Sequence, residues 1–266
     1  MGHPATQEAA ALLDQAERVV VFTGAGMSAE SGVPTFRDAL TGLWQRFDAQ
    51  ALATPEAFRA DPALVWGWYE WRRHAVQQAQ PNAGHRAVAA IEARVPNTVL
   101  VTQNVDDLHE RAGSANPVHL HGSLFAPRCS ACAHPASTPY GEADEPTDGP
   151  VPPPRCARCA ADIRPGVVWF GEALPTAALE AAVEAASSCD LLVTVGTSGL
   201  VYPAAEIPQV AARLGATVIQ VNPEETPLDR VATVNLRGPA ARVLPALVEA
   251  AWGDTDQVPD ESPGDA

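Results

Sequence analysis

The chain has 266 residues, 46% of them hydrophobic, so it is long enough for one large domain or two unequal ones. It carries 32 acidic against 17 basic residues, a net charge of -15, which argues against direct nucleic-acid binding and against an anionic membrane surface. Five cysteines in a chain that begins without a signal-peptide pattern favour a cytoplasmic protein with metal or thiol chemistry over a disulfide framework.

Short apolar runs alternate with helical patterns along most of the chain. An Ala-rich amphipathic helix is expected over residues 5–17, and the β-branched run 19–23 leads directly into a glycine turn. Further buried strands are expected at 98–102, 191–195 and 217–221. This alternation predicts an α/β fold, a doubly wound parallel sheet. The segments that build it are 1–37, 85–127 and 165–252.

Two insertions interrupt this pattern. Residues 38–84 are rich in Trp, Arg and Ala and are expected to be helical. Residues 128–164 carry four of the five cysteines and a Pro-rich acidic stretch, and this insertion has too little core to fold without a staple. The acidic tail 253–266 is expected to be disordered.

The glycine turn Gly24-x-Gly26-x-x-Ala29 lies after a strand and before a helix, as in the relaxed dinucleotide-binding fingerprint. Glycine lets the backbone approach phosphate groups, and the helix N-terminus favours an anion. A tight turn without a ligand is the alternative interpretation. In dinucleotide-binding folds, an acidic residue at the end of a second strand normally holds the adenosine ribose. Here a polar loop that reaches Asp38 stands in place of that strand, so other residues would have to hold the ribose of a bound nucleotide.

The four cysteines of the second insertion form two CxxC pairs separated by 23 residues, Cys129/Cys132 and Cys156/Cys159. This spacing is typical of a zinc ribbon, in which each pair holds one side of a tetrahedral ion. Four thiolates leave no open position for water, so the predicted zinc is structural. A redox pair, free thiols or an iron centre are the alternatives.

Four further motifs occur in order along the chain: TQNVDDLH at 102–109, HLHGS at 119–123, GTS at 196–198 and VNPE at 221–224. With GAGMSAESGVPTFRD at 24–38 and the cysteine quartet, they make the chain resemble the sirtuin family of NAD-dependent protein lysine deacylases over residues 15–250. The resemblance implies a Rossmann-like larger domain. It also implies a smaller domain that combines a zinc module with a helical module.

The resemblance also implies which residues form the active site. His121, a residue type that titrates near neutral pH, would be the general base, and Gln103 and Asn104 would order the ribose and nearby water. Asp106 would hold the nicotinamide amide. The residues implied to contact the co-substrate NAD are Gly24, Ala25, Gly26, Glu30, Thr35, Phe36, Arg37, Trp44, Gln103, Asn104, Val105, Asp106, Gly196, Thr197, Ser198, Asn222, Pro223, Glu224 and Ala240.

The implied partner is an acylated lysine of a protein substrate, bound by a monomeric enzyme. Its backbone would pair as an added strand with residues Val168, Trp169, Phe170, Gly171 and Glu172. On a helix, Tyr69 and Arg72 share one face and can converge on a carboxylate. With Ala49 and Ala53 widening the pocket, the resemblance implies removal of succinyl, malonyl or glutaryl groups in preference to acetyl. Simple packing of Tyr69 and Arg72 is the alternative.

Three other functions remain open at this point. A generic protein-lysine deacetylase would use the same residues without an acid receptor. A mono-ADP-ribosyltransferase would use the same cleavage of NAD with a different acceptor. A non-catalytic binding module could dock partners through the zinc ribbon. The products expected for the deacylase are free lysine, nicotinamide and 2'-O-acyl-ADP-ribose.

Overall fold

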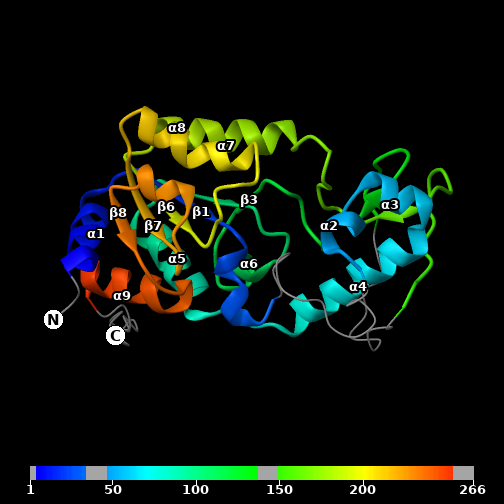
Figure 1. The fold of residues 1–266 in the computed structure, drawn as a ribbon, viewed down its shortest axis with the longest axis horizontal. Helices are drawn as coiled ribbons and strands as arrows, with labels where there is room; N and C mark the ends of the chain where they lie inside the picture. Colours follow the sequence, from blue (N-terminus) through cyan, green and yellow to red (C-terminus); the bar gives the residue numbers. More distant parts are fainter. Residues whose placement is uncertain (1–3, 34–46, 137–148, 254–266) are drawn as a thin grey trace, which may run out of the picture.

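The computed structural model describes residues 4–33, 47–136 and 149–253. Its centre is a six-stranded sheet in the order β3-β2-β1-β6-β7-β8, in which every neighbouring pair is parallel (Figure 1). The strands are β1 (Val19–Thr23), β2 (Thr98–Thr102), β3 (Val118–His119), β6 (Leu191–Val195), β7 (Thr217–Val221) and β8 (Val234–Leu236). This order confirms the predicted doubly wound α/β fold.

Helices cover both faces of this sheet (Figure 1). The helices and short 3-10 turns of this part of the chain are α1 (Pro4–Gln15), η1 (Ala25–Met27), η2 (Ala29–Ser31), α5 (Ala83–Arg94), α6 (Leu108–Arg111), α7 (Thr176–Ser188), η4 (Ala204–Glu206), α8 (Ile207–Arg213), η5 (Pro227–Arg230) and α9 (Ala240–Trp252). Helices α1, α5 and α9 pack on one face, and α7 and α8 pack on the other. The sheet is therefore buried on both sides, as an all-parallel sheet requires.

Strand β1 shows how the two cores are divided. Val19 and Val21 belong to the core under α1, α5 and α9. Val20 and Phe22 belong to the core under α7 and α8. Because successive side chains of a strand point to opposite faces, one fully apolar strand supplies both layers. This explains why the sequence has continuous apolar runs instead of alternation.

The four strands expected from the sequence are confirmed at the same residues. The expected helix 5–17 ends earlier, at Gln15, and this boundary was wrong. The backbone N–H groups of Glu17 and Arg18 instead donate to the Asp190 carboxylate at 3.2 and 3.1 Å. Strands β3 and β8 were not expected because each has only two or three residues.

The remaining helices and two strands form the smaller part of the molecule. They are α2 (Ala49–Leu52), α3 (Pro55–Ala60), α4 (Pro62–Gln78), β4 (Arg128–Cys129) and β5 (Ile163–Arg164), with β4 and β5 paired antiparallel. Thr54 and Asp61 cap α3 and α4, accepting from Ala57 N and Leu64 N at 3.1 and 2.9 Å. These caps, each followed by Pro, fix where the two helices begin.

Helix α4, which lies in the first insertion, packs against the second. Trp66 packs with Cys129, Cys156 and Ile163 of the cysteine-bearing insertion. Gly67 of α4 lies against Gly149 of the second insertion. A Cβ at position 67 would be 2.4 Å from the carbonyl oxygen of Gly149. The two insertions, far apart in sequence, therefore share a packed interface along α4.

No helix among the described residues is long and apolar enough to cross a membrane.

Replacing Phe22 by Ala is expected to lower the free energy of unfolding by about 3–5 kcal/mol, because this fully buried ring fills the α7/α8 core. Chemical denaturation would measure the change. The matched control is Leu214→Ala, where the side chain is 63% exposed and a change within about 0.5 kcal/mol is expected. Equal destabilisation by both variants would contradict this assignment of the core.

Candidate active site and metal centre

Four loops leave the carboxyl ends of neighbouring parallel strands and meet at one edge of the sheet. They follow β1, β2, β6 and β7, and they contain the predicted segments Gly24–Gly26, Gln103–Asp106, Gly196–Ser198 and Asn222–Glu224. Strands β1 and β6 are neighbours from which the chain proceeds in opposite directions across the sheet. Ligands of open α/β sheets bind at such a switch point.

The loops after β1 and β6 touch backbone to backbone. Gly26 N donates to Gly196 O at 2.8 Å, and Gly24 N donates to Val195 O at 2.9 Å. A Cβ on Gly26 would lie 2.7 Å from the Cα of Gly196. Gly196 has φ of +60°, a conformation that favours glycine. The glycines predicted to approach phosphate are thus also required for these two loops to fit together.

Thr197 joins the β2 and β7 loops to this contact. Gln103 Nε2 donates to Thr197 Oγ1 at 3.0 Å, and Asn222 Nδ2 donates to the Thr197 carbonyl at 2.9 Å. Asn222 Oδ1 in turn accepts from Glu224 N at 3.2 Å. Four predicted NAD contacts, from the loops after three different strands, are therefore in one hydrogen-bond network.

Ser28 is the centre of a second network, deeper in the site. Asn104 Nδ2 donates to Ser28 Oγ at 3.1 Å, and Ser28 Oγ donates to Asp106 Oδ2 at 2.9 Å. Asp106 Oδ1 also accepts from Leu108 N at 3.2 Å. Burial raises the pKa of Asp106, although these hydrogen bonds oppose the rise. Ser28 was not among the predicted site residues.

Two buried histidines, His85 and His109, lie next to these networks. Neither was predicted as a site residue. His85 Nδ1 accepts from Asn82 N at 3.2 Å, so His85 Nε2 carries the hydrogen and faces Ser28 Oγ at 3.4 Å. The His109 ring lies 4.9 Å from that of His85, and its Nε2 is 3.1 Å from Thr23 Oγ1. Burial lowers the pKa of His85 to about 4 and that of His109 to about 3, so both are neutral at pH 7. The Asn82-x-x-His85 capping box was the available sequence signal.

His121 has the geometry of a general base. Its Nδ1 lies 2.9 Å from the Gln103 carbonyl oxygen, which can only accept, so Nδ1 carries the hydrogen. A neutral ring then has its lone pair on Nε2. Burial lowers the pKa of His121, and the bond to Gln103 opposes this only in part. The ring is therefore neutral and able to accept a proton at pH 7.

Tyr69 and Arg72 lie together on α4, as the sequence predicted. Tyr69 is 3% exposed and accepts a hydrogen bond from Trp169 Nε1 at 3.1 Å. Burial raises the pKa of Tyr69 to about 12, so its phenol stays protonated. The guanidinium carbon of Arg72 lies 5.6 Å from the Tyr69 ring centroid. Ala49 and Ala53 belong to the same packed cluster as Tyr69.

The segment predicted to pair with a peptide is anchored at both sides. Val168 N donates to the His121 carbonyl at 2.8 Å, and Phe170 N donates to the Ala53 carbonyl at 2.9 Å. Trp169 N donates to Glu172 Oε2, and Glu172 N donates to Trp169 O. Four of the five N–H groups of 168–172 are thus hydrogen-bonded within the protein. These bonds place the segment between His121 and the pocket around Tyr69.

Several predicted NAD contacts lie outside the described residues, namely Thr35, Phe36, Arg37 and Trp44. Glu30 and Ala240 are described and lie near each other, because Glu30 Oε2 accepts from Ala241 N at 2.7 Å. This bond satisfies one backbone donor at the N-terminus of α9. Glu30 therefore ties the β1 loop to α9.

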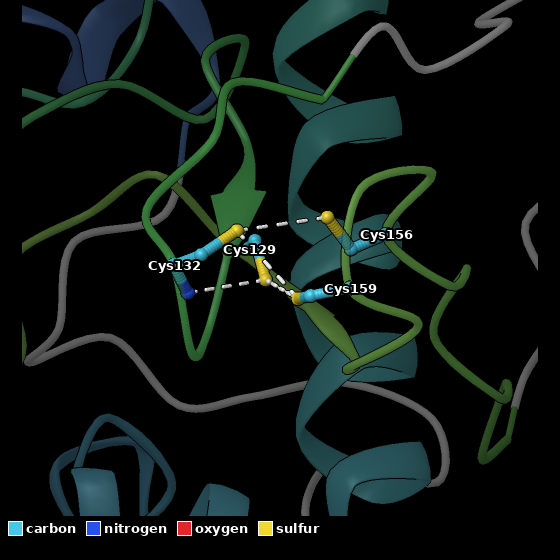
Figure 2. A group of neighbouring side chains, drawn as sticks. All are labelled: Cys129, Cys132, Cys156 and Cys159. Carbon is cyan, nitrogen blue, oxygen red and sulfur yellow. Dashed lines mark hydrogen bonds between the residues drawn. The ribbon is translucent and has the colours of Figure 1, made fainter.

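The four predicted metal ligands converge (Figure 2). The sulfur atoms of Cys129, Cys132, Cys156 and Cys159 all lie within 4.8 Å of one another. Three of the Sγ–Sγ distances are 3.4, 3.6 and 3.8 Å, at or slightly below the separation of about 3.8 Å expected around a tetrahedral zinc with bonds of about 2.3 Å. Four thiolates in this arrangement fit one structural zinc ion.

Each CxxC turn has the same local geometry. Ala133 and Ala160, the residues after each pair, have φ of +55° and +59°. Their N–H groups donate to the carbonyls of Cys129 and Cys156 at 3.1 and 2.8 Å. Backbone N–H groups, that of Cys132 first, donate to the Cys129 sulfur and lower its pKa to about 6. The two turns therefore direct backbone N–H groups at the first sulfur of each pair, Cys129 and Cys156.

Comparison with known proteins gives a consistent result. Residues 24–203 match the Sir2 family. The chain is 61% identical to an NAD-dependent protein deacylase of Methylococcus capsulatus over 92% of this chain and 96% of the relative. It is 59% identical to NAD-dependent protein deacylase 1 of Pseudomonas aeruginosa, over 91% and 97%. A crystal structure of a Sir2 homologue in complex with NAD is 44% identical, covers 92% of this chain and 93% of its own, and has a TM-score of 0.85.

With its fold, its glycine loops and its cysteine quartet in place, the chain belongs to the Sir2 family. The matched region contains His121, Thr197, the network around Ser28 and all four cysteines.

Replacing Cys156 by Ser is expected to remove the zinc ion and to lower the thermal unfolding midpoint by about 10 °C, because three thiolates hold the ion poorly and the insertion has little other core. Elemental analysis and calorimetry measure the two effects. Cys189→Ser, which changes a thiol outside the quartet, is the control and should keep one zinc per chain. A Cys156→Ser protein with full zinc content would refute the assignment.

Proposed function

We propose that this member of the Sir2 family is an NAD-dependent protein-lysine deacylase that removes succinyl, malonyl and related acidic acyl groups in preference to acetyl. The observation that carries the acyl preference is the placement of Tyr69 and Arg72 side by side in the pocket next to Trp169. The deacylase activity is supported by the names of the relatives from M. capsulatus and P. aeruginosa.

The residues at the sheet edge fit NAD. The glycine loops after β1 and β6 bring backbone close to the switch point, where phosphates bind in this fold class. Asn222 and Glu224 would hold the adenosine ribose, and Asp106 would bind the nicotinamide amide. When bound, NAD supplies a ribose that accepts the acyl group, with release of nicotinamide and formation of 2'-O-acyl-ADP-ribose.

His121 would take the proton from the attacking ribose hydroxyl. Its Nε2 is the basic atom because Nδ1 donates to Gln103. That bond also fixes the ring to the backbone of the β2 loop, which carries Asn104 into the Ser28 network. The base and the groups that would order the ribose therefore move as one unit, which preserves their geometry during the reaction.

The substrate backbone would pass along residues 168–172. Because most N–H groups of this segment are already hydrogen-bonded, a peptide added as a strand would donate mainly to its carbonyl oxygens. The acylated lysine would then enter between this segment and His121, whose carbonyl oxygen accepts from Val168. The acyl end would reach Tyr69 and Arg72 on α4.

An acidic acyl group is favoured by charge and by hydrogen-bonding capacity. Arg72 supplies a permanent cation with donors in a planar fork, and the protonated phenol of Tyr69 supplies a further donor. Hydrogen bonds to a charged group contribute about 1.5–3 kcal/mol each when partly desolvated. An acetyl group reaches neither partner and has no charge to offset the burial of the guanidinium.

The acyl preference can be measured as the ratio of kcat/KM for one peptide carrying succinyl-lysine or acetyl-lysine. The double variant Tyr69→Phe/Arg72→Met is expected to lower the succinyl-to-acetyl ratio by roughly 100-fold, since two hydrogen bonds to a carboxylate are lost. The control is Arg59→Met, which removes an exposed cation on α3. A wild-type enzyme that prefers acetyl, with no change in the variant, would reduce the assignment to a generic deacetylase.

The role of His121 predicts a pH dependence. Its pKa is lowered from 6.5 by burial, so the basic form persists down to that lower value, and kcat/KM should fall only as the pH decreases through it. The acid limb is therefore expected below pH 6.5. His121→Tyr should reduce turnover of every acyl group by about 10²–10⁴-fold with the thermal midpoint retained. Unchanged turnover in this variant would rule out His121 as the base.

A further inference from the structure

The oxygen of Tyr69 accepts a hydrogen bond from a group that can only donate. Trp169 Nε1 donates to Tyr69 Oη at 3.1 Å, and both side chains are 3% exposed. An indole N–H has no acceptor atom, so this bond uses a lone pair of the phenol oxygen. The hydrogen of the neutral phenol must therefore point away from the indole.

We propose that Trp169 determines acyl specificity through Tyr69: its indole N–H occupies a lone pair of the phenol oxygen, so that the Tyr69 hydrogen points away from the indole and is available to the acyl group. This inference rests on the proposed function, because an oriented O–H donor matches an acyl carboxylate. Trp169 is a positioning residue in this scheme, since its indole N–H is bonded to Tyr69.

The indole of Trp169 is fixed by neighbours from the cysteine-bearing insertion. The guanidinium carbon of Arg164 lies 3.4 Å from the Trp169 ring centroid, so the two planar groups are stacked. Arg164 also binds Glu172 with two hydrogen bonds, Nη1 to Oε1 at 2.5 Å and Nη2 to Oε2 at 2.9 Å. Glu172 Oε2 accepts from the backbone N of Trp169 at 2.9 Å. One carboxylate therefore anchors both the backbone of Trp169 and the cation that covers its ring.

The indole of Trp169 also packs against two further rings. Phe58 packs at a centroid distance of 5.3 Å from Trp169, and the Tyr69 ring lies at 6.5 Å. These contacts leave the indole little freedom to rotate its N–H away from Tyr69. Arg164 belongs to β5, which pairs with β4 of the zinc module. The orientation of the Tyr69 hydroxyl is thus connected to the metal-holding part of the molecule through Arg164 and Trp169.

The energetic consequence differs between substrates. A hydroxyl that is free to rotate must be ordered when a carboxylate binds, whereas the Tyr69 hydroxyl is already oriented by the bond from Trp169. Removing the indole N–H frees a lone pair, so the phenol hydrogen can turn toward the place that the N–H occupied. The resulting loss of binding affinity affects acyl groups whose far end accepts hydrogen bonds. Because this contact is remote from the reacting carbonyl, it should appear in KM more than in kcat.

The experiment is a double-mutant cycle between Trp169→Phe and Tyr69→Phe, read as the succinyl-to-acetyl ratio of kcat/KM on one peptide. Trp169→Phe is expected to lower the ratio about tenfold, mostly through KM for the succinyl peptide. In the Tyr69→Phe background, the same change should alter the ratio less than twofold, because the oxygen through which Trp169 acts is gone. The matched control is Trp66→Phe, which shortens a buried Trp on α4 that packs against the cysteines.

A second variant separates the effect of losing the indole N–H from the effect of a smaller ring. Site-specific replacement of Trp169 by benzothienylalanine keeps a bicyclic ring with sulfur in place of the N–H group. It should reproduce the fall in the ratio with the thermal midpoint of the wild type, and it covers the case in which Trp169→Phe does not fold. A fall caused by packing alone would appear in Trp169→Phe and be absent from the benzothienylalanine protein, and that result would overturn the proposal.

Further outcomes also decide against it. Equal losses for succinyl and acetyl peptides, or an effect of Trp169→Phe that persists undiminished without the Tyr69 hydroxyl, would show that Trp169 only supports the fold of the pocket. A wild-type enzyme without succinyl preference would refute the proposed acyl preference and this inference together. Wild-type preference for succinyl with an unchanged ratio in both Trp169 variants would refute this inference alone.

Discussion

The contact between the glycine turns after β1 and β6 is the constraint on which the rest of the site depends. Gly26 and Gly196 approach so closely that a single added Cβ would collide with backbone. This approach places Thr197 within hydrogen-bond reach of Gln103 and Asn222, which come from strands on either side. Without it, the four loops would end at the same edge of the sheet without forming one connected site.

Helix α4 packs against two different clusters in the smaller part of the molecule. Trp66 faces the cysteines, whereas Trp68 and Tyr69 belong to the cluster that includes Trp169. Adjacent residues of one helix thus support the metal module and the cluster around Tyr69. The four-cysteine site and the cluster around Tyr69 are therefore joined through α4.

Burial has the same effect on the charge of several groups near the reaction centre. It lowers the pKa of His85, His109 and His121 and raises the pKa of Asp106. In each case the low-dielectric interior disfavours the charged form. The site therefore meets its substrates with neutral histidines whose hydrogen positions are set by their partners, as the bond from His121 Nδ1 to Gln103 illustrates. Burial also lowers the pKa of Arg72, but a guanidinium titrates so far above neutral pH that it stays cationic.

The sequence by itself determined the four long strands, the doubly wound sheet, the cysteine quartet and the placement of Tyr69 and Arg72 on one helix face, because apolar runs, CxxC spacing and helical periodicity are local signals. It did not reveal β3, β8, Ser28, His85 or the indole contact of Trp169. Short strands carry too few residues for a pattern, and a hydrogen bond between residues 100 positions apart leaves no local trace. Only the tertiary structure decided which group donates to the Tyr69 oxygen, since that depends on packing α4 against the segment that carries Trp169.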